Sequence, residues 1–238
     1  PTRISAAQAS QVSIPDTDAP GDIDAAHNHM FAIHEQGFFN NTWFSDPMIL
    51  GHNPADGLAL YEDDMPAMQD GDLATIHQPL DFFGANIYSG RYVHATTDGG
   101  IEKLPDSDQP VTAMGWPITP EALYWAPRFF HERYGLPIVI TENGMANDDR
   151  LENGAVDDQP RINFLQSYLQ HYARAIAEGV PAQGYFLWSV MDNFEWAEGY
   201  SKRFGLIHVD YASQRRTLKA SAQWYGRVIA ANGGNLGL

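Results

Sequence analysis

The chain has 238 residues, of which 14 are Lys or Arg and 30 are Asp or Glu, so its formal net charge is −16. This excess of negative charge opposes binding to nucleic acid or to an anionic membrane, because both surfaces repel it. Hydrophobic residues make up 44% and aromatic residues 12% of the sequence, enough for a large packed core. The sequence contains no cysteine, which excludes disulfides, thiolate nucleophiles and cysteine-ligated zinc.

No apolar run has the length of a membrane span, which needs roughly 18 or more consecutive apolar residues. Residues 1–20 lack the basic and apolar regions of a secretion signal, and the chain begins at Pro1 rather than Met. We therefore expect a cut or truncated start, no membrane partner and a cytoplasmic location. The length suits one domain or a large part of one.

The first part of the chain predicts a helix, a second short helix and one strand between polar segments. Residues 1–24 are rich in Pro, Asp, Ser and Ala, which is typical of an extended surface segment. Apolar residues from Asp22 to about Trp43 recur on one face, as in a helix. Residues 65–76 have the mixed polarity of a short helix, and residues 82–88 form an apolar run that turns polar at its end, as a buried strand does where it reaches a site.

The second part predicts helices that alternate with strands. Residues 94–118 contain several prolines and glycines and predict a loop, and residues 119–134 predict a helix that begins at Thr119. The β-branched run over 136–141 predicts a fully buried strand. The other expected elements are a helix over 157–178, a strand over 184–191 and a helix over 224–231. Such alternation is typical of parallel βαβ units.

The spacing of the three expected strands bears on the fold. They begin about 50 residues apart, whereas an eight-unit α/β barrel needs about 30 residues per unit and about 250 in all. At this spacing the chain supplies only about three or four units. The sheet is therefore either small and open or a piece of a barrel, and we favour a piece because none of the three strands carries a charged residue of the kind that marks an edge strand.

The residues at the carboxyl ends of these strands are the candidates for function, because functional side chains of α/β barrels lie there. This position selects Asn86 with Tyr88, then Glu142, then Trp188 and the residues after it. Glu142 alone is either an ordinary turn carboxylate or a nucleophile or base at the barrel mouth. Tryptophans beside carboxylates suit a pyranose, whose apolar face stacks on an indole while its hydroxyls need charged acceptors.

Several motifs then resemble glycoside hydrolase family 1, the β-glucosidases and β-galactosidases. Residues 140–144 (ITENG) resemble the nucleophile motif of that family, and residues 184–205 (GYFLWSVMDNFEWAEGYSKRFG) resemble a second, longer motif. Further matches are N-x-W-F-x-D-P over 41–47, F-G-x-N-x-Y over 83–88 and G-W-x-I-x-P over 115–120. The resemblance covers essentially the whole chain but only the C-terminal half or so of the family's length.

The resemblance implies roles for the residues around the nucleophile. It implies that Glu142 attacks the sugar and forms the glycosyl-enzyme. It also implies that Tyr88 donates a hydrogen bond to that carboxylate, which keeps it ionised and aimed. Asn86 lines the same pocket in this interpretation.

The resemblance also implies a sugar-binding wall. Trp188 forms the floor under the ring, Glu195 and Trp196 bind the outer hydroxyls at the closed end, Phe204 packs nearby, and Trp116 flanks the leaving group. The phospho-sugar branch of the family typically has Ser where Glu195 stands, because a carboxylate repels phosphate. We therefore expect a free glycoside, such as a β-glucoside or a cello-oligosaccharide, and no cofactor.

One part of the family's chemistry has no counterpart in the sequence. The acid/base of the family is the Glu of an Asn-Glu-Pro motif, and no Asn-Glu-Pro occurs in the 238 residues. The predicted fold class is therefore α/β, with residues 1–238 forming the C-terminal part of a (β/α)8 barrel, about three of eight units and incomplete alone. The predicted function is retaining β-glycoside hydrolysis by double displacement, with the complementary N-terminal half of the barrel as partner.

Two alternatives stay open at this point. The first is a carbohydrate-binding remnant of the same barrel that has lost turnover. The second is metal-dependent hydrolysis through His27, His29 and His34, but a spacing of two residues puts the first two on different helix faces, so solvated histidines and no metal are the better interpretation. The sequence does not separate glucoside from galactoside or fucoside preference.

Overall fold

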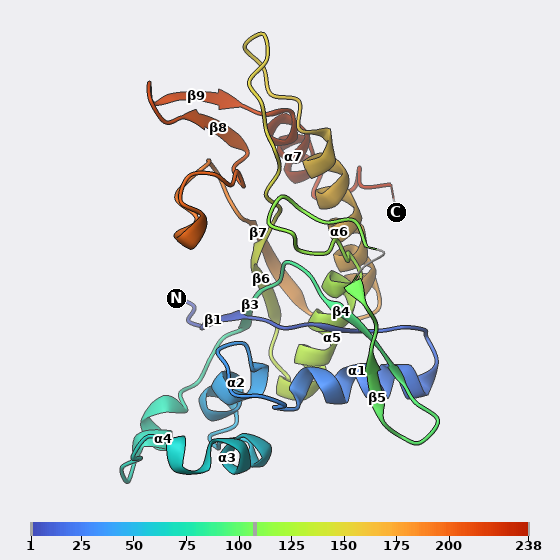
Figure 1. The fold of residues 1–238 in the computed structure, drawn as a ribbon, viewed down its shortest axis with the longest axis vertical. Coiled ribbons are helices and arrows are strands. Elements are labelled where there is room, and N and C mark those ends of the chain that lie inside the picture. The colour runs from blue at the N-terminus through green and yellow to red at the C-terminus, as the bar shows by residue number, and fades with distance from the viewer. Residues whose placement is uncertain (1, 107–108, 238) are drawn as a thin grey trace.

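The computed structural model describes residues 2–106 and 109–237 (Figure 1). Its strands are β1 (Ala7–Ala9), β2 (Ser13–Pro15), β3 (Phe83–Asn86), β4 (Arg91–Ala95), β5 (Ile101–Lys103), β6 (Ile138–Asn143), β7 (Ala182–Leu187), β8 (Ile207–Asp210) and β9 (Arg215–Leu218). Its α-helices are α1 (Pro20–Phe31), α2 (Asn41–Ile49), α3 (Ala55–Tyr61), α4 (Asp72–Ile76), α5 (Ala122–Tyr134), α6 (Gln159–Ala177) and α7 (Ala220–Ala230). Short 3₁₀ turns lie at η1 (Glu62–Asp64) and η3 (Trp196–Glu198).

The central feature is a parallel four-stranded sheet in the order β1-β3-β6-β7. The connection from β3 to β6 includes α5, and the connection from β6 to β7 includes α6. Because the strands are parallel, their carboxyl ends lie at one edge of the sheet. The residues after Asn86, Asn143 and Leu187, where β3, β6 and β7 end, therefore meet at this edge.

The core lies between one face of the sheet and the helices α5 and α6, which Figure 1 shows on one side of it. Ile138 and Ile140 of β6 are fully buried there, and Phe83 of β3 stacks on Phe130 of α5 at a ring-centroid distance of 4.3 Å. Phe186, next to the core residue Tyr185, points to the opposite face and is 62% exposed. Phe186 thus adds exposed apolar surface to the second face of the sheet.

Two smaller sheets flank the central one. Strands β2, β4 and β5 form the first, and the antiparallel hairpin β8–β9 forms the second. The hairpin stands apart from the central sheet at the upper left of Figure 1 and leads into α7, which packs on α6. Within residues 2–106 and 109–237, no helix is both long enough and apolar enough to cross a bilayer.

The amino-terminal segment differs from the sequence expectation. An extended surface segment over residues 1–24 was expected, but Ala7–Ala9 pair in register with Gly84–Asn86 and Ile14 is buried in the core. The expectation was therefore wrong over residues 7–15, and the parallel sheet has four strands instead of the three expected. A three-residue strand of small and polar residues carries no apolar periodicity, so only its pairing with β3 reveals it.

Two other expectations change in detail. The single helix expected over residues 22–43 was wrong: α1 ends at Phe31 and α2 begins only at Asn41, whose side chain donates a hydrogen bond to the carbonyl of Met30 at 2.9 Å. The loop expected over 94–118 contains β5, which pairs with β4. Residue 1 of the expected surface segment and residues 107 and 108 of the expected loop lie outside the described residues.

Candidate active site

Glu142 lies at the carboxyl end of β6, and its carboxylate is held by Tyr88. The Tyr88 hydroxyl, two residues beyond the end of β3, donates a hydrogen bond to Glu142 Oε2 at 2.6 Å. Burial is the main cause that raises the pKa of Tyr88 far above its usual value near 10, and the hydrogen bond to Glu142 adds to the rise. The phenol therefore keeps its proton and acts as the donor. Strand pairing between β3 and β6 therefore brings together two residues that are 54 positions apart.

The residue after Glu142 fixes the end of the strand. Asn143 is fully buried; its Nδ2 donates to the carbonyl of Ile87 (2.8 Å), and its Oδ1 accepts a hydrogen bond from the Tyr185 hydroxyl (2.7 Å). Asn143 and Tyr185 were not among the site residues predicted from the sequence. The Glu-Asn-Gly triplet was the available signal, because a polar residue directly after a buried strand needs partners of its own.

Gly144 must be glycine at this turn. A Cβ on residue 144 would lie 1.9 Å from the carbonyl oxygen of Trp188, a distance that no side chain tolerates. The amide of Trp188 in turn donates to the carbonyl of Asn143 at 2.9 Å. The exits of β6 and β7 therefore touch backbone to backbone, and Trp188 stands next to the residues that follow Glu142.

Asn86 belongs to β3, which flanks the strand of Glu142 on the side away from β7 and Trp188. Its Oδ1 accepts a hydrogen bond of 2.6 Å from Thr141, the residue before Glu142. The pairing between β3 and β6 shifts register between Ala85 and Asn86, so that Asn86 lies opposite Glu142. Asn86 is half-buried, and among residues 2–106 and 109–237 its side-chain amide nitrogen has no hydrogen-bond partner, so it can donate to a ligand.

Glu195 and Trp188 form a second pair in the site. The indole nitrogen of Trp188 donates to Glu195 Oε1 at 3.1 Å, and Glu195 is only 8% exposed although it belongs to a loop. Burial is the main cause that raises the pKa of Glu195; the hydrogen bond from Trp188 opposes it, and the negative charge of Glu142 adds to the rise. The two carboxylates are therefore close enough to interact.

Trp196 behaves differently from its neighbour. Trp196 is 84% exposed, and its backbone φ of 47° lies in the left-handed region that residues other than glycine rarely adopt. It therefore extends from the loop beside Glu195 with its indole in solvent. The structure brings Glu195 to Trp188 but leaves Trp196 projecting from the site.

The remaining candidates form an aromatic cluster on the outer side of the site. The ring centroids of Tyr88 and Trp116 are 5.2 Å apart, and the centroid of Phe204 lies 6.0 Å from that of Trp116. Phe204 is buried, and Lys202, two residues earlier, donates to the carbonyl of Ala113 at 2.6 Å. The segments that carry Trp116 and Phe204 are thus fastened to each other.

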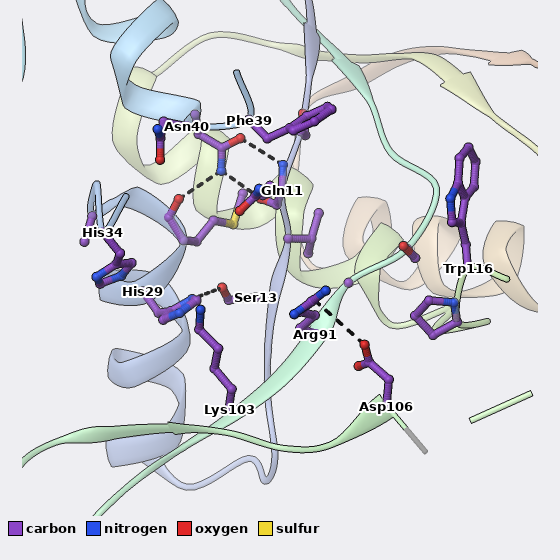
Figure 2. Close-up of a pocket in the computed structure, with 18 of the residues that line it drawn as sticks. Gln11, Ser13, His29, His34, Phe39, Asn40, Arg91, Lys103, Asp106 and Trp116 are labelled. Atoms are coloured by element: carbon purple, nitrogen blue, oxygen red, sulfur yellow. Dashed lines mark hydrogen bonds and ion pairs between the residues drawn. The ribbon is translucent and has the colours of Figure 1, made fainter. Parts of the chain in front are cut away.

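A hollow of about 420 Å³ opens beyond Trp116 (Figure 2). Glu142 does not line it, and Trp116 is the one predicted site residue that does. His29 in this hollow accepts or donates a hydrogen bond with Ser13 (2.8 Å), and burial, helped by neighbouring basic side chains, lowers its pKa to about 4. His29 and His34 stack on each other, and within the described part of the chain no group of three or more His, Asp or Glu side chains is arranged to hold a metal ion.

This arrangement defines a class of protein. Parallel strands that deliver a tyrosine-bound carboxylate, a second carboxylate and several indoles to one edge of a sheet are typical of a carbohydrate-active α/β barrel. The chain matches the family Glycosyl hydrolase family 1 over residues 1–234. The chain belongs to this family, as its motifs predicted.

Individual relatives agree with the family. The chain is 44% identical to Beta-glucosidase A of Thermotoga maritima over 199 residues, which cover 82% of this chain and 45% of the relative. It is 43% identical to a bifunctional β-D-glucosidase/β-D-fucosidase of Bifidobacterium breve over 222 residues, which cover 84% of this chain and 48% of that protein. The chain thus spans about half the length of these curated relatives.

Solved structures show the same relation. The β-glucosidase of Thermotoga maritima in complex with glucoimidazole superposes with a TM-score of 0.79 at 39% identity, covering 95% of this chain and 50% of that one. The same enzyme in complex with deoxynojirimycin gives a TM-score of 0.78. The expected fold class is confirmed: the chain is α/β and corresponds to part of a (β/α)8 barrel.

Proposed function

We propose that this chain supplies the C-terminal half of a retaining β-glycosidase that acts on terminal β-D-glucosyl residues. The observation that carries the proposal is the hydrogen bond of 2.6 Å from Tyr88 to Glu142, beside the Trp188–Glu195 pair. A carboxylate that accepts a phenolic hydrogen bond stays ionised and oriented, which a nucleophile requires. Membership in a family whose relatives are named β-glucosidases supports the same conclusion.

The proposed mechanism is double displacement. Glu142 attacks the anomeric carbon while a carboxylic acid from outside these residues protonates the leaving oxygen, which breaks the glycosidic bond and forms a glycosyl-enzyme ester. That second carboxylate then removes a proton from water, and the water oxygen displaces Glu142 from the anomeric carbon. Retaining enzymes hold the two carboxyl groups about 5–5.5 Å apart, so the acid/base is expected at about that distance from the Glu142 carboxylate.

In this proposal the other site residues bind and orient the sugar. The buried carboxylate of Glu195 accepts hydrogen bonds from outer hydroxyls through the oxygen that Trp188 leaves free, and the Trp188 indole forms the floor. The exposed Trp196 covers the outer end, and Asn86 uses its amide nitrogen on a hydroxyl. Trp116 flanks the leaving group, and the buried Phe204 packs near it.

The proposed substrate is a free β-glucoside or cello-oligosaccharide. A negative carboxylate at Glu195, whose charge already interacts with that of Glu142, disfavours a phosphate in the same place. Relatives are named β-glucosidase, β-D-fucosidase and 1,4-β-D-glucan glucohydrolase. The proposal therefore does not specify the sugar or the leaving group further. No cofactor enters the proposed mechanism, and the cytoplasmic location stays a prediction.

The proposed partner is the complementary N-terminal half of the barrel, with residues 1–238 as the C-terminal half of one catalytic domain. Each end strand, β1 and β7, pairs with one neighbour inside the sheet, and an unpaired strand edge attracts a further strand. An apolar hollow of about 480 Å³ lined by Phe38, Trp43 and Phe44 lies beside β1, and Phe186 is exposed on the sheet face. These surfaces suit burial against further barrel elements.

The test is turnover of an aryl β-glucoside by the chain alone and by the chain mixed with the N-terminal half of a relative. The proposal expects turnover only in the mixture, and loss of it when Glu142 in the mixture is changed to Gln. Turnover by the chain alone would show that the acid/base need not come from elsewhere. Glucose binding without turnover in a well-folded mixture would instead favour a carbohydrate-binding remnant.

A further inference from the structure

A cluster of charges, buried except for the partly exposed Arg203, lies beneath the two loops that carry the site. Its members are Asp149, Asp158, Arg161, Asp192, Arg203 and Lys219. Three acids and three bases give no net charge, and the Lys219 side chain is 0% exposed. No role in the proposed chemistry uses these groups.

Asp192 closes the loop that carries Glu195. Its Oδ1 accepts a hydrogen bond from the amide of Gly205 at 3.0 Å, and its Oδ2 accepts one from Arg203 at 2.6 Å. A Cβ on residue 205 would lie 2.1 Å from the amide nitrogen of Asp192, so only glycine permits this approach. The loop between Asp192 and Gly205 therefore has its two ends tied together at one carboxylate.

Asp149 fixes the other loop, the one that follows Glu142. Both its oxygens accept hydrogen bonds from Arg161 at the start of α6, with Arg161 Nη2 2.7 Å from Asp149 Oδ2. The same nitrogen of Arg161 donates to the carbonyl of Arg203 at 2.7 Å. The loop after β6 is thus held to α6 and to the end of the second loop.

Lys219 joins the two systems. It is the residue before α7, and its Nζ donates to Asp149 Oδ2 at 2.5 Å and to Asp192 Oδ1 at 2.7 Å. A single ammonium group therefore sets the distance between the loop after the nucleophile and the loop that carries the sugar-binding carboxylate. A buried ammonium with two carboxylate partners has few alternative positions, because any other position leaves a charge unpaired in the interior.

We propose that Lys219 is a positioning residue for Glu195, holding the sugar-binding carboxylate in its place relative to Glu142. The proposal rests on the proposed function for its kinetic consequence, but the position of Glu195 is measurable without activity. The Trp188 indole N–H donates to Glu195 Oε1, so its NMR signal reports where that carboxylate lies.

The first experiment measures that signal in the chain itself. Lys219→Met keeps the length of the side chain and removes the ammonium, and the Trp188 indole N–H signal, assigned by its absence in Trp188→Phe, is expected to shift. The matched control is Arg133→Met, which breaks the pair between the half-buried Arg133 and the buried Asp46 (2.5 Å), joining α5 and α2 far from the two loops. Both variants are expected to lower the melting temperature, but only Lys219→Met is expected to move the signal.

The second experiment measures sugar discrimination in the chain combined with an N-terminal half. The ratio of kcat/KM for an aryl β-glucoside to that for an aryl β-D-fucoside, which lacks the 6-hydroxyl and has the opposite configuration at C4, is expected to change about tenfold in Lys219→Met and not in Arg133→Met. A ratio is used because loss of folded enzyme cancels from it. The double variant Lys219→Met with Asp149→Asn restores charge balance, so it is expected to regain melting temperature while the ratio stays changed.

The outcomes separate this inference from the proposed function. An unmoved Trp188 signal in a folded Lys219→Met chain, or equal shifts in Lys219→Met and Arg133→Met, would show that the cluster only stabilises the fold. Recovery of both the melting temperature and the Trp188 signal in the double variant would also show that the cluster only stabilises the fold. If the unmodified combination has no turnover, the proposed function fails while the NMR comparison still decides the role of Lys219.

Discussion

The nucleophile side and the sugar-binding wall of the candidate site are built in different ways. Tyr88, Glu142 and Asn143 lie at or just beyond the ends of two paired strands, and backbone register alone brings them together. Glu195 instead belongs to a loop whose ends meet at the buried carboxylate of Asp192. Strand register can thus position a reactive group by itself, whereas a loop needs tertiary contacts to hold its side chains.

The largest expected effect concerns the nucleophile. Glu142→Gln keeps the shape of the side chain but removes its negative charge, so the combined enzyme should lose turnover by about 10⁴-fold or more. The measurement is hydrolysis of an aryl β-glucoside, with a melting curve to show that the variant folds. A rate near that of the unmodified enzyme would show that Glu142 is not the nucleophile.

The next largest effect concerns the wall. Glu195→Ala removes a charge-assisted hydrogen bond to the sugar and leaves the Trp188 indole N–H without its partner, a loss of about 3 kcal/mol or about 100-fold in kcat/KM. Discrimination between glucoside and fucoside should weaken as well. Glu198→Ala, an exposed change on the same loop, is the control and should leave both quantities unchanged.

A smaller effect is expected for the residue that orients the nucleophile. Tyr88→Phe removes one hydrogen bond to a carboxylate, worth about 1.5 kcal/mol, so kcat should fall about tenfold with little change in KM. Tyr92→Phe is a matched control, because the Tyr92 hydroxyl donates to Glu121 at 2.8 Å in another part of the molecule. Equal losses in the two variants would indicate general destabilisation.

The smallest effect tests whether the two sides interact. Burial, with the charge of Glu142, raises the pKa of Glu195 above its usual value near 4.5, so the ionised form that binds sugar best is lost as the pH falls through that raised pKa. Glu142→Gln removes the repulsion, so the pKa of Glu195 should fall and sugar binding should persist to lower pH. The measurement is glucose affinity as a function of pH in both forms; identical profiles would mean that the carboxylates act independently.

The sequence predicted the parts of the fold with strong local signals. The run Ile138–Val139–Ile140 could only be a buried strand, and Glu142 directly after it had to lie at the sheet edge. The same reasoning failed for Ala7–Ala9, because small residues in a three-residue strand have no periodicity of their own. Asn143 and Tyr185 escaped notice because their meaning lies in contacts across three strands.

The amino-acid sequence by itself determined the class of fold, the family and the position of Glu142 at a strand end, because hydrophobic runs and local motifs are properties of consecutive residues. Only the tertiary structure decided which side chains face Glu142, how Glu195 is buried and how Lys219 joins two loops. These are contacts between residues from 7 to 70 positions apart. Their existence depends on strand register and on pairing of buried charges, which no local stretch of sequence contains.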